Sequence, residues 1–188
     1  MIHSSRFLAV LDANVLYPAP LRDYLLSLAE LGLYKPKWSN EIQDEWIRKV
    51  LVNRPDLKKQ QLEKTHIAMD SAFPDATITH YESLIEGLSL PDKKDRHVLA
   101  AAIREKADVI VTINLKDFPP AYLKTFDIEV QHPDEFITNL IHLDKIKSLE
   151  ALNNQARRLQ NPPKMMDEVL AMLKKCGLKH SVSLLRTL

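Results

Sequence analysis

The 188-residue sequence is poor in glycine and cysteine and has no long apolar run. Its glycines, Gly32, Gly87 and Gly177, are too few for the glycine-rich loops that cradle nucleotide phosphates, which excludes GxGxxG and Walker-type nucleotide binding. The single cysteine, Cys176, excludes an intramolecular disulfide and a multi-cysteine zinc site. No apolar run approaches the roughly 18 residues of a membrane helix, and the start, MIHSSRFLAVLDANV, lacks the features of a signal peptide. These absences predict a cytoplasmic protein with no membrane segment.

The overall composition is that of an ordinary globular protein, with 45% hydrophobic and 27% charged residues. The net charge of +1 conceals an asymmetry: residues 1–144 carry 17 basic and 22 acidic residues, whereas residues 145–188 carry 9 and 3. The two parts therefore either contact different partners or attract each other within the fold.

Short apolar runs alternate with amphipathic stretches, which predicts an α/β domain with a mainly parallel central sheet flanked by helices. Strands are expected within 7–11, 76–84, 109–113 and 128–130, with 34–38 either a strand or an extended link. Helices are expected over 21–31, 39–51, 55–73, 91–107 and 133–143. We place this domain at residues 1–143 and a helical C-terminal extension of two helices, broken by NPP at 161–163, at residues 144–188.

Acidic residues follow the expected strands at the point where each strand ends. Asp12 comes directly after the apolar run FLAVL, and Asp117 lies just beyond VIVTI. Asp92 and Asp95 occupy the first turn of the helix that precedes VIVTI. Because strand ends and the starts of the following helices converge on one edge of a parallel sheet, these residues should gather there. Glu45, near the apolar side of the second long helix, is a further candidate.

Each acidic residue also has a purely structural explanation. Asp92 is a natural N-cap, Asp95 can complement the helix dipole, and Asp117 can be a turn residue. Glu45 has acidic neighbours on its helix, so one solvated face would account for it. Asp12 is the hardest to explain in this way, because a carboxylate after five apolar strand residues should be partly buried, and buried charge is costly unless it is paired.

A divalent cation would relieve the repulsion among these carboxylates. A site made of oxygen donors, with few or no histidines, suits Mg²⁺ or Mn²⁺ and not zinc. Such an ion can generate a water nucleophile and stabilise a phosphodiester in its transition state. Metal-dependent phosphodiester hydrolysis is therefore the chemistry that these residues favour.

Four segments, in their order and spacing, resemble the PIN-domain nucleases: LDANVLYP, the helix with Glu45, PDKKDRHVLAAAI and VTINLKDFP. In detail they resemble the VapC-type toxins of bacterial toxin–antitoxin pairs, and RRLQNPPKMMDEVLAMLKKCGL resembles the C-terminal extension of one VapC-like subgroup. The resemblance implies a PIN-like fold, Mg²⁺- or Mn²⁺-dependent endoribonuclease activity on RNA, a homodimer, and inhibition by a cognate antitoxin protein.

Carried over residue by residue, the resemblance implies that the metal-binding and catalytic acids are Asp12, Glu45, Asp95 and Asp117. It makes Asn14, Asp92, Thr112 and Asn114 auxiliary polar groups. Asn14 would hydrogen-bond a carboxylate or the backbone, and Thr112 would place a hydroxyl near the site. Many PIN domains have an acid where Asn114 stands, so the fourth ligand is either Asn114 or Asp117. We favour Asp117, because a charged oxygen holds Mg²⁺ better than an amide.

Basic residues of the extension are candidates for holding RNA phosphates, namely Arg157, Arg158, Lys164, Lys174 and Lys175. Three other roles remain open for them: a solvated helix face, a surface for an acidic partner, or part of a brace behind the domain. We expect Trp38 and Trp46 to pack in the interior and not to stack on a base. His97 should lie roughly opposite Asp95 on its helix, which argues against a metal role.

Two other functions compete with a nuclease. A catalytically weak PIN-like module would bind RNA or a protein without cutting. A HAD-like phosphatase also places an aspartate after its first strand, but it needs a second aspartate two residues later, where this sequence has Asn14.

Overall fold

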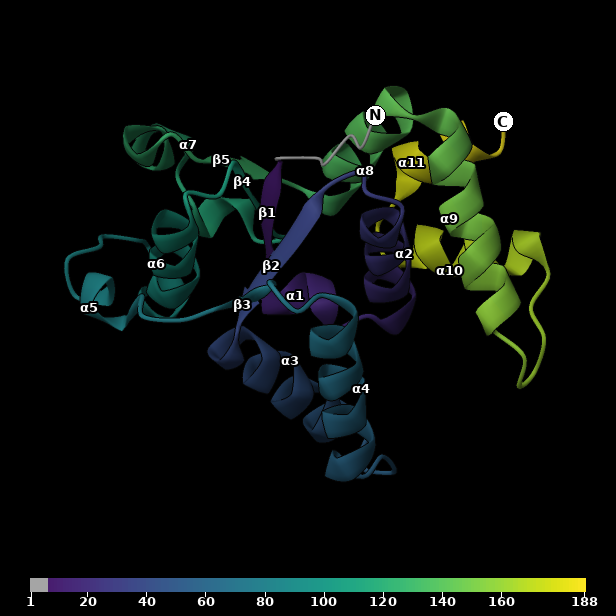
Figure 1. Ribbon diagram of the computed structural model, residues 1–188, viewed down its shortest axis with the longest axis horizontal. Coiled ribbons are helices and arrows are strands. Elements are labelled where there is room, and N and C mark those ends of the chain that lie inside the picture. The colour runs from purple at the N-terminus through teal and green to yellow at the C-terminus, as the bar shows by residue number, and fades with distance from the viewer. Residues whose placement is uncertain (1–6) are drawn as a thin grey trace.

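The computed structural model describes residues 7–188 and has a parallel five-stranded sheet at its centre (Figure 1). In spatial order the strands are β3 (Thr77–Ile78), β2 (Lys35–Ser39), β1 (Leu8–Leu11), β4 (Val109–Val111) and β5 (Glu129–Gln131). The central strand β1 pairs with both β2 and β4, with Val10 opposite Lys37 on one side and Ile110 on the other. The expected α/β class with a parallel sheet is confirmed, and the segment at 34–38 belongs to a strand.

Strands β1 and β4 are buried on both faces, as expected from their β-branched and aliphatic residues. Both strands are shorter than their apolar runs. Phe7 and Ile113 lie outside them and are each 40% exposed, so the strand expected within 109–113 ends at Val111. Ile113 is exposed because the chain leaves the sheet at Thr112 to form the loop that carries Asn114.

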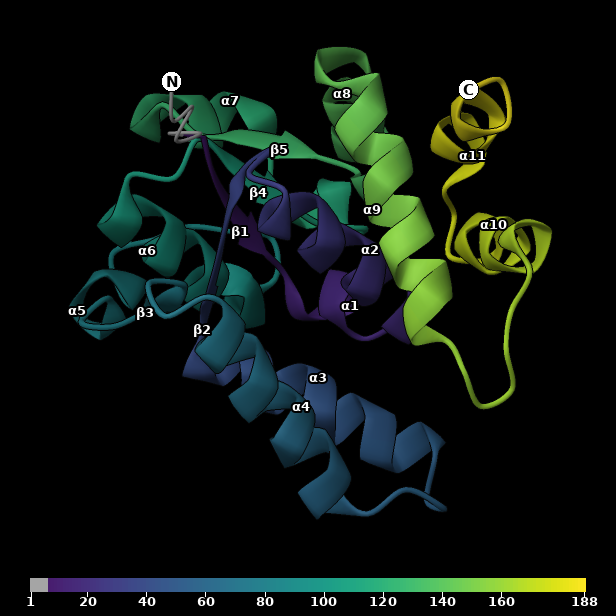
Figure 2. The same cartoon turned by 45° about the vertical axis from the view of Figure 1, so that its right-hand side comes forward.

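Helices cover the two faces of the sheet and its carboxyl edge (Figures 1 and 2). The long ones are α2 (Ala19–Glu30), α3 (Asn40–Asn53), α4 (Lys59–Ala72), α6 (Arg96–Glu105), α8 (Pro133–Leu143), α9 (Lys145–Arg158) and α10 (Met166–Lys175). Helix α6 lies on one side of the sheet and α2 on the other, while α3 leaves the end of β2 with α4 packed against it. The Ser39 side chain caps α3 by accepting a hydrogen bond from the Ile42 amide.

Several short elements were not expected from the sequence. They are α1 (Ala13–Leu16), α5 (Glu82–Ile85), α7 (Pro120–Leu123), α11 (Lys179–Leu185) and the 3₁₀ turns η1 (Lys93–Asp95), η2 (Leu115–Asp117) and η3 (Lys124–Phe126). Elements of about one helical turn show too few residues for a periodic apolar pattern to be recognised. Two of them, η1 and η2, carry acidic residues of the predicted site.

The C-terminal extension forms an outer layer against α2 (Figure 2). The Tyr24 hydroxyl donates to the Ser148 carbonyl over 3.1 Å, and the Gln155 amide donates to the Pro20 carbonyl over 2.8 Å. Helix α8 also contacts the extension, because its Asp134 side chain accepts hydrogen bonds from the first residues of α11. The extension therefore contains three helices after residue 144, one more than expected.

Two further expectations concern the whole chain. The domain division after residue 143 stays a prediction, and the first six residues of the expected domain lie outside the described ones. Among residues 7–188, no helix is both long and apolar enough to cross a membrane. Trp38 and Trp46 are fully buried, which confirms that both are packing residues.

Candidate active site

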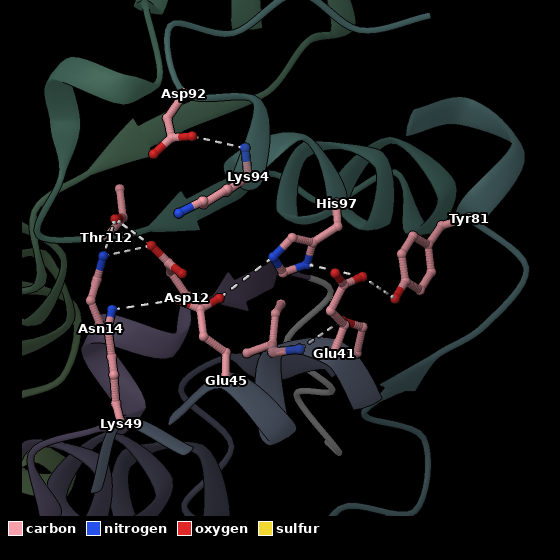
Figure 3. Close-up of polar contacts among 12 residues, drawn as sticks. Asp12, Asn14, Glu41, Glu45, Lys49, Tyr81, Asp92, Lys94, His97 and Thr112 are labelled. Atoms are coloured by element: carbon pink, nitrogen blue, oxygen red, sulfur yellow. Dashed lines mark hydrogen bonds and ion pairs between the residues drawn. The ribbon is translucent and has the colours of Figure 1, made fainter. Parts of the chain in front are cut away.

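Asp12 lies at the carboxyl end of the central strand and begins α1 (Figure 3). Its backbone amide continues the sheet by donating to the Val111 carbonyl over 3.1 Å, and its carbonyl accepts the Val15 amide of α1. The residue is only 4% exposed. The chain therefore fixes Asp12 through its backbone on both sides of the strand–helix junction.

Two polar side chains orient the Asp12 carboxylate. The Thr112 hydroxyl donates to Oδ2 over 2.7 Å, and the Asn14 amide donates to the same oxygen over 2.6 Å. Asn14 also accepts a hydrogen bond from the Ile113 amide, so it bonds both the carboxylate and the backbone. Burial raises the pKa of Asp12, and the Thr112 hydrogen bond only partly opposes that effect. Asn14 and Thr112 thus lie where the sequence placed them.

Asp95 ends η1, the turn that leads into α6, and Asp92 directly precedes this turn. The Asp92 side chain caps this turn by accepting the Lys94 amide over 2.9 Å, which confirms its expected N-cap position. Asp95 is half-buried. Burial, reinforced by four neighbouring carboxylates, raises the pKa of Asp95 to about 6. Those neighbours are Asp12, Asp92, Asp117 and Glu45.

The charges of Asp12, Asp92, Asp117 and Glu45 all raise the pKa of Asp95, so these acids act on one another electrostatically. Asp12 follows β1 and Asp117 follows β4, which are neighbouring parallel strands that end at the same edge of the sheet. Glu45 adds to the effect from α3. The joint role of these acids as one site stays a prediction.

Glu45 is held by a residue that the sequence argument had set aside. His97 of α6 is 5% exposed and lies between two glutamates of α3, with Nε2 at 3.6 Å from Glu45 Oε2 and Nδ1 at 3.7 Å from Glu41 Oε2 (Figure 3). The interaction with His97 lowers the pKa of Glu45. The contact of His97 with Glu45 was not predicted from the sequence, because it joins α6 to α3 and depends on how these two helices pack.

Asn114 and Asp117 lie in the turn after β4. The Asn114 backbone amide donates to the Thr112 hydroxyl over 3.1 Å, and its backbone carbonyl accepts the Asp117 backbone amide over 3.0 Å. Phe118, which follows, is fully buried and anchors the turn. Asp117 contributes to the raised pKa of Asp95, whereas the Asn114 side chain makes no hydrogen bond to any residue in 7–188.

A divalent cation matches the chemistry of this group, because its donors are carboxylate oxygens and two of the carboxyls have raised pKa values. Within residues 7–188, no three acidic, histidine or cysteine side chains already converge as a ready coordination sphere. Binding of a metal by more than two of the acids therefore requires side-chain rotation at this edge.

The basic residues of the extension do not join this group. Arg158 pairs with Glu30 of α2, and Lys164 pairs with Glu168 one helical turn away. Arg157, Lys174 and Lys175 are exposed on the outer layer. Their assignment to RNA binding stays a prediction, while the contacts of Arg158 correspond to the bracing role.

Two family models match the chain. One described as "PIN domain" matches residues 8–116, more than half of the chain, and contains every acidic residue of the site except Asp117, which follows it directly. The other, described as "VapC50 C-terminal domain", matches residues 133–187. This chain belongs to the PIN-domain family.

Membership in the PIN-domain family confirms the expected fold and makes a HAD-like phosphatase untenable. The second match begins at α8 and therefore groups that helix with the extension. A protein named "Putative ribonuclease VapC50" from Mycobacterium tuberculosis (strain ATCC 25618 / H37Rv) is 58% identical over 50 residues, which is 27% of this chain and 30% of that protein. The PIN-domain chain thus aligns with less than a third of that relative's length, and no solved structure gives a significant match.

Proposed function

We propose that this PIN-domain chain is a metal-dependent endoribonuclease of the VapC toxin type, which hydrolyses RNA phosphodiester bonds at the carboxyl edge of its sheet. One observation carries the proposal: Asp12 is buried and oriented at the end of the central strand, within electrostatic reach of the other acids. Strongly perturbed carboxyls in such a position are characteristic of catalytic sites. The name of the partial relative, a ribonuclease, supports RNA as the substrate.

The acids would hold Mg²⁺ or Mn²⁺, with Asp12 and Asp95 as primary ligands. Asp117 is our choice over Asn114 as a further ligand, because its charge acts on Asp95. A bound ion would supply a nucleophilic water and stabilise negative charge on the phosphodiester. Its positive charge would also hold Asp95 in the ionised form, against the burial and repulsion that raise its pKa.

The remaining residues position these acids. Thr112 and Asn14 hold one oxygen of Asp12 and thereby fix the direction of its carboxylate. Asp92 caps η1 and so sets the turn from which Asp95 projects. His97 holds Glu45, the residue that binds metal or orients the attacking water. Each contact reduces the number of orientations that an acid can adopt before substrate binds.

The proposal extends to the biological setting. A cognate antitoxin protein would inhibit the enzyme, and the protein would act as a homodimer in the cytoplasm. Support for these partners comes from the family resemblance and from the second family match.

Cleavage by purified protein tests the proposal. Wild type, Asp12→Asn and Asp95→Asn are incubated with RNA in Mg²⁺, Mn²⁺ or a chelator, beside Asp44→Asn, an exposed acid on α3 next to Glu45. Loss of a residue that supports a metal ligand typically lowers activity by about 10–100-fold. Loss of a ligand itself should therefore lower the cleavage rate by more than about 100-fold. Wild type and Asp44→Asn should cut only with metal, whereas both site variants should not cut.

Two outcomes would contradict the proposal. Folded Asp12→Asn and Asp95→Asn proteins that cut as well as wild type would show that the acids are not the site. Wild-type protein that binds RNA and leaves it intact in both metals would identify a binding module.

A further inference from the structure

A cavity of about 430 Å³ adjoins the acidic site on the side of α3 and α6. Its wall is formed by Glu41, Glu45, Arg48, Lys49, Lys94 and His97. Glu45 belongs to both the cavity and the acidic group, so the two are continuous. In Figure 3 the Lys94 side chain extends from η1 toward the region of Asp12 and Thr112.

Basic side chains line this cavity. Lys49 pairs with Glu45 over 3.4 Å, with half of its side chain exposed. Arg48 and Lys94 are exposed and form no ion pair with any residue among 7–188. Two cations beside a group of carboxylates thus remain available to a ligand.

One buried polar atom of the cavity wall also lacks a partner. His97 Nδ1 is shielded from solvent and makes no hydrogen bond, because the nearest glutamate oxygen, of Glu41, is 3.7 Å away. A buried polar group without a partner is costly, typically by about 1–3 kcal/mol. A ligand oxygen, or a water that it orders, can remove this cost.

An RNA substrate needs positively charged side chains such as Arg48 and Lys94 near the acids. Its backbone carries one negative charge per phosphate, and the acids around Asp95 repel it. The basic residues of the extension cannot offset that repulsion at the site, because α9 to α11 form the outer layer beyond α2 (Figure 2). The cavity is where positive charge and the proposed scissile position adjoin.

We propose that this cavity is a phosphate subsite: Arg48 and Lys94 hold a backbone phosphate of single-stranded RNA that flanks the bond to be cut. Lys49 assists while remaining paired with Glu45. The proposal rests on the proposed function for the identity of its ligand as RNA. It places the RNA path along α3 and η1 and not across the C-terminal extension.

Salt-dependent binding of RNA by a non-cutting protein tests the subsite. The Asp12→Asn background keeps RNA intact, and a labelled single-stranded oligoribonucleotide is titrated at several salt concentrations. Each phosphate contact with a single strand contributes about 0.7 to the slope of log affinity against log salt. Adding Arg48→Gln and Lys94→Gln should weaken binding and reduce that slope by about 1.4, the loss of two contacts.

Arg104→Gln with Lys106→Gln is the matched control, because it removes one arginine and one lysine from the exposed C-terminal end of α6. It should leave both affinity and slope unchanged. Lys174→Gln with Lys175→Gln tests the alternative RNA path across α10. All three pairs are exposed, so circular dichroism should show native folds.

The outcomes separate this inference from the proposed function. If the Arg48/Lys94 pair binds RNA with the parental slope, or if only the Lys174/Lys175 pair weakens binding, the subsite is wrong even when wild type cleaves RNA. If the Arg48/Lys94 pair behaves as expected but wild type never cuts, the subsite stands and the nuclease proposal fails. Binding of an acidic protein at Arg48 and Lys94, with no binding of RNA there, would show that the ligand is not RNA.

Discussion

At the carboxyl edge of the sheet, Asp12 and Asp95 form no ion pair with a described residue, whereas in the extension Arg158 pairs with Glu30 and Arg186 with Asp167. At the sheet edge, burial and repulsion by neighbouring carboxylates raise the pKa of both aspartates. In the extension, oppositely charged side chains that project from different helices meet. Folding by itself favours the second arrangement, and the first supports the proposed function, in which a bound cation offsets the repulsion.

The contacts of Asp134, on α8, with the start of α11 should contribute most to the stability of the extension. Asp134 is 7% exposed and accepts the His180 amide, the Ser181 amide and the Ser181 hydroxyl at 2.7–2.9 Å. Asp134→Ala would leave the His180 and Ser181 amides without this acceptor, whereas the Ser181 hydroxyl would keep the Asp134 carbonyl, so the free energy of unfolding should fall by about 2–3 kcal/mol. Chemical denaturation measures this change.

Asp167→Ala is the control for Asp134→Ala, because Asp167 is an acid of the same extension in an exposed pair. It should cost less than about 1 kcal/mol. Equal losses in the two variants would show that the Asp134 contacts do not anchor α11. Burial raises the pKa of Asp134, but the Ser181 and His180 hydrogen bonds outweigh it and lower the pKa overall. The stabilisation is therefore present above the ordinary aspartate pKa and is lost as the pH falls through the lower, folded-state value.

Removing a negative charge at the sheet edge should raise the free energy of unfolding, whereas Asp134→Ala lowers it. In the absence of divalent metal, Asp95→Asn should raise the free energy of unfolding at pH 7 by about 1–2 kcal/mol, a figure reduced for the solvent screening of this half-exposed group. Because the folded-state pKa of Asp95 is raised to about 6, wild type loses stability between about pH 4 and pH 6 as this carboxyl ionises. The advantage of the variant should grow over that window and be constant above it.

Denaturation of both proteins in a chelator at pH 4 and pH 7 measures the effect, with Asp44→Asn as the exposed control. A variant that is no more stable than wild type at pH 7 would contradict the view that the edge is electrostatically strained. By the proposed function the same variant loses cleavage, so stability and activity should move in opposite directions.

Patterns local in sequence predicted most of the fold. The alternation of apolar runs with long amphipathic stretches identified the parallel sheet and its covering helices, since burial imposes those periods. The family resemblance placed Thr112, 100 residues away, near Asp12, and the physical reason for their contact is that neighbouring parallel strands end at one edge. Helices of about one turn were not predicted, because they contain too few residues to show a period, and the contact of His97 with Glu45 depends on the packing of α6 against α3.

Ion pairs between residues far apart in the chain were the other feature that could not be predicted from the sequence. The basic character of residues 145–188 is plain in the sequence, yet Glu30, the partner of Arg158, lies 128 residues away on α2. Only the packing of α9 on α2 decides that Arg158 braces the domain. Unpaired cations such as Arg48 and Lys94 were unremarkable in the sequence for the same reason.

Removing the ion pair between Arg158 and Glu30 should have the smallest effect on the free energy of unfolding. Arg158→Gln removes a partly exposed ion pair with Glu30 and a 3.4 Å contact with the Ser27 hydroxyl, which should lower the free energy of unfolding by about 0.5 kcal/mol. Arg157→Gln removes an equal charge from a neighbouring side chain that pairs with no residue among 7–188, so it should have no measurable effect. The loss at Arg158 should shrink in high salt, because exposed pairs are screened. Equal losses for both arginines would mean that the charge of the extension, and not this pairing, stabilises the fold.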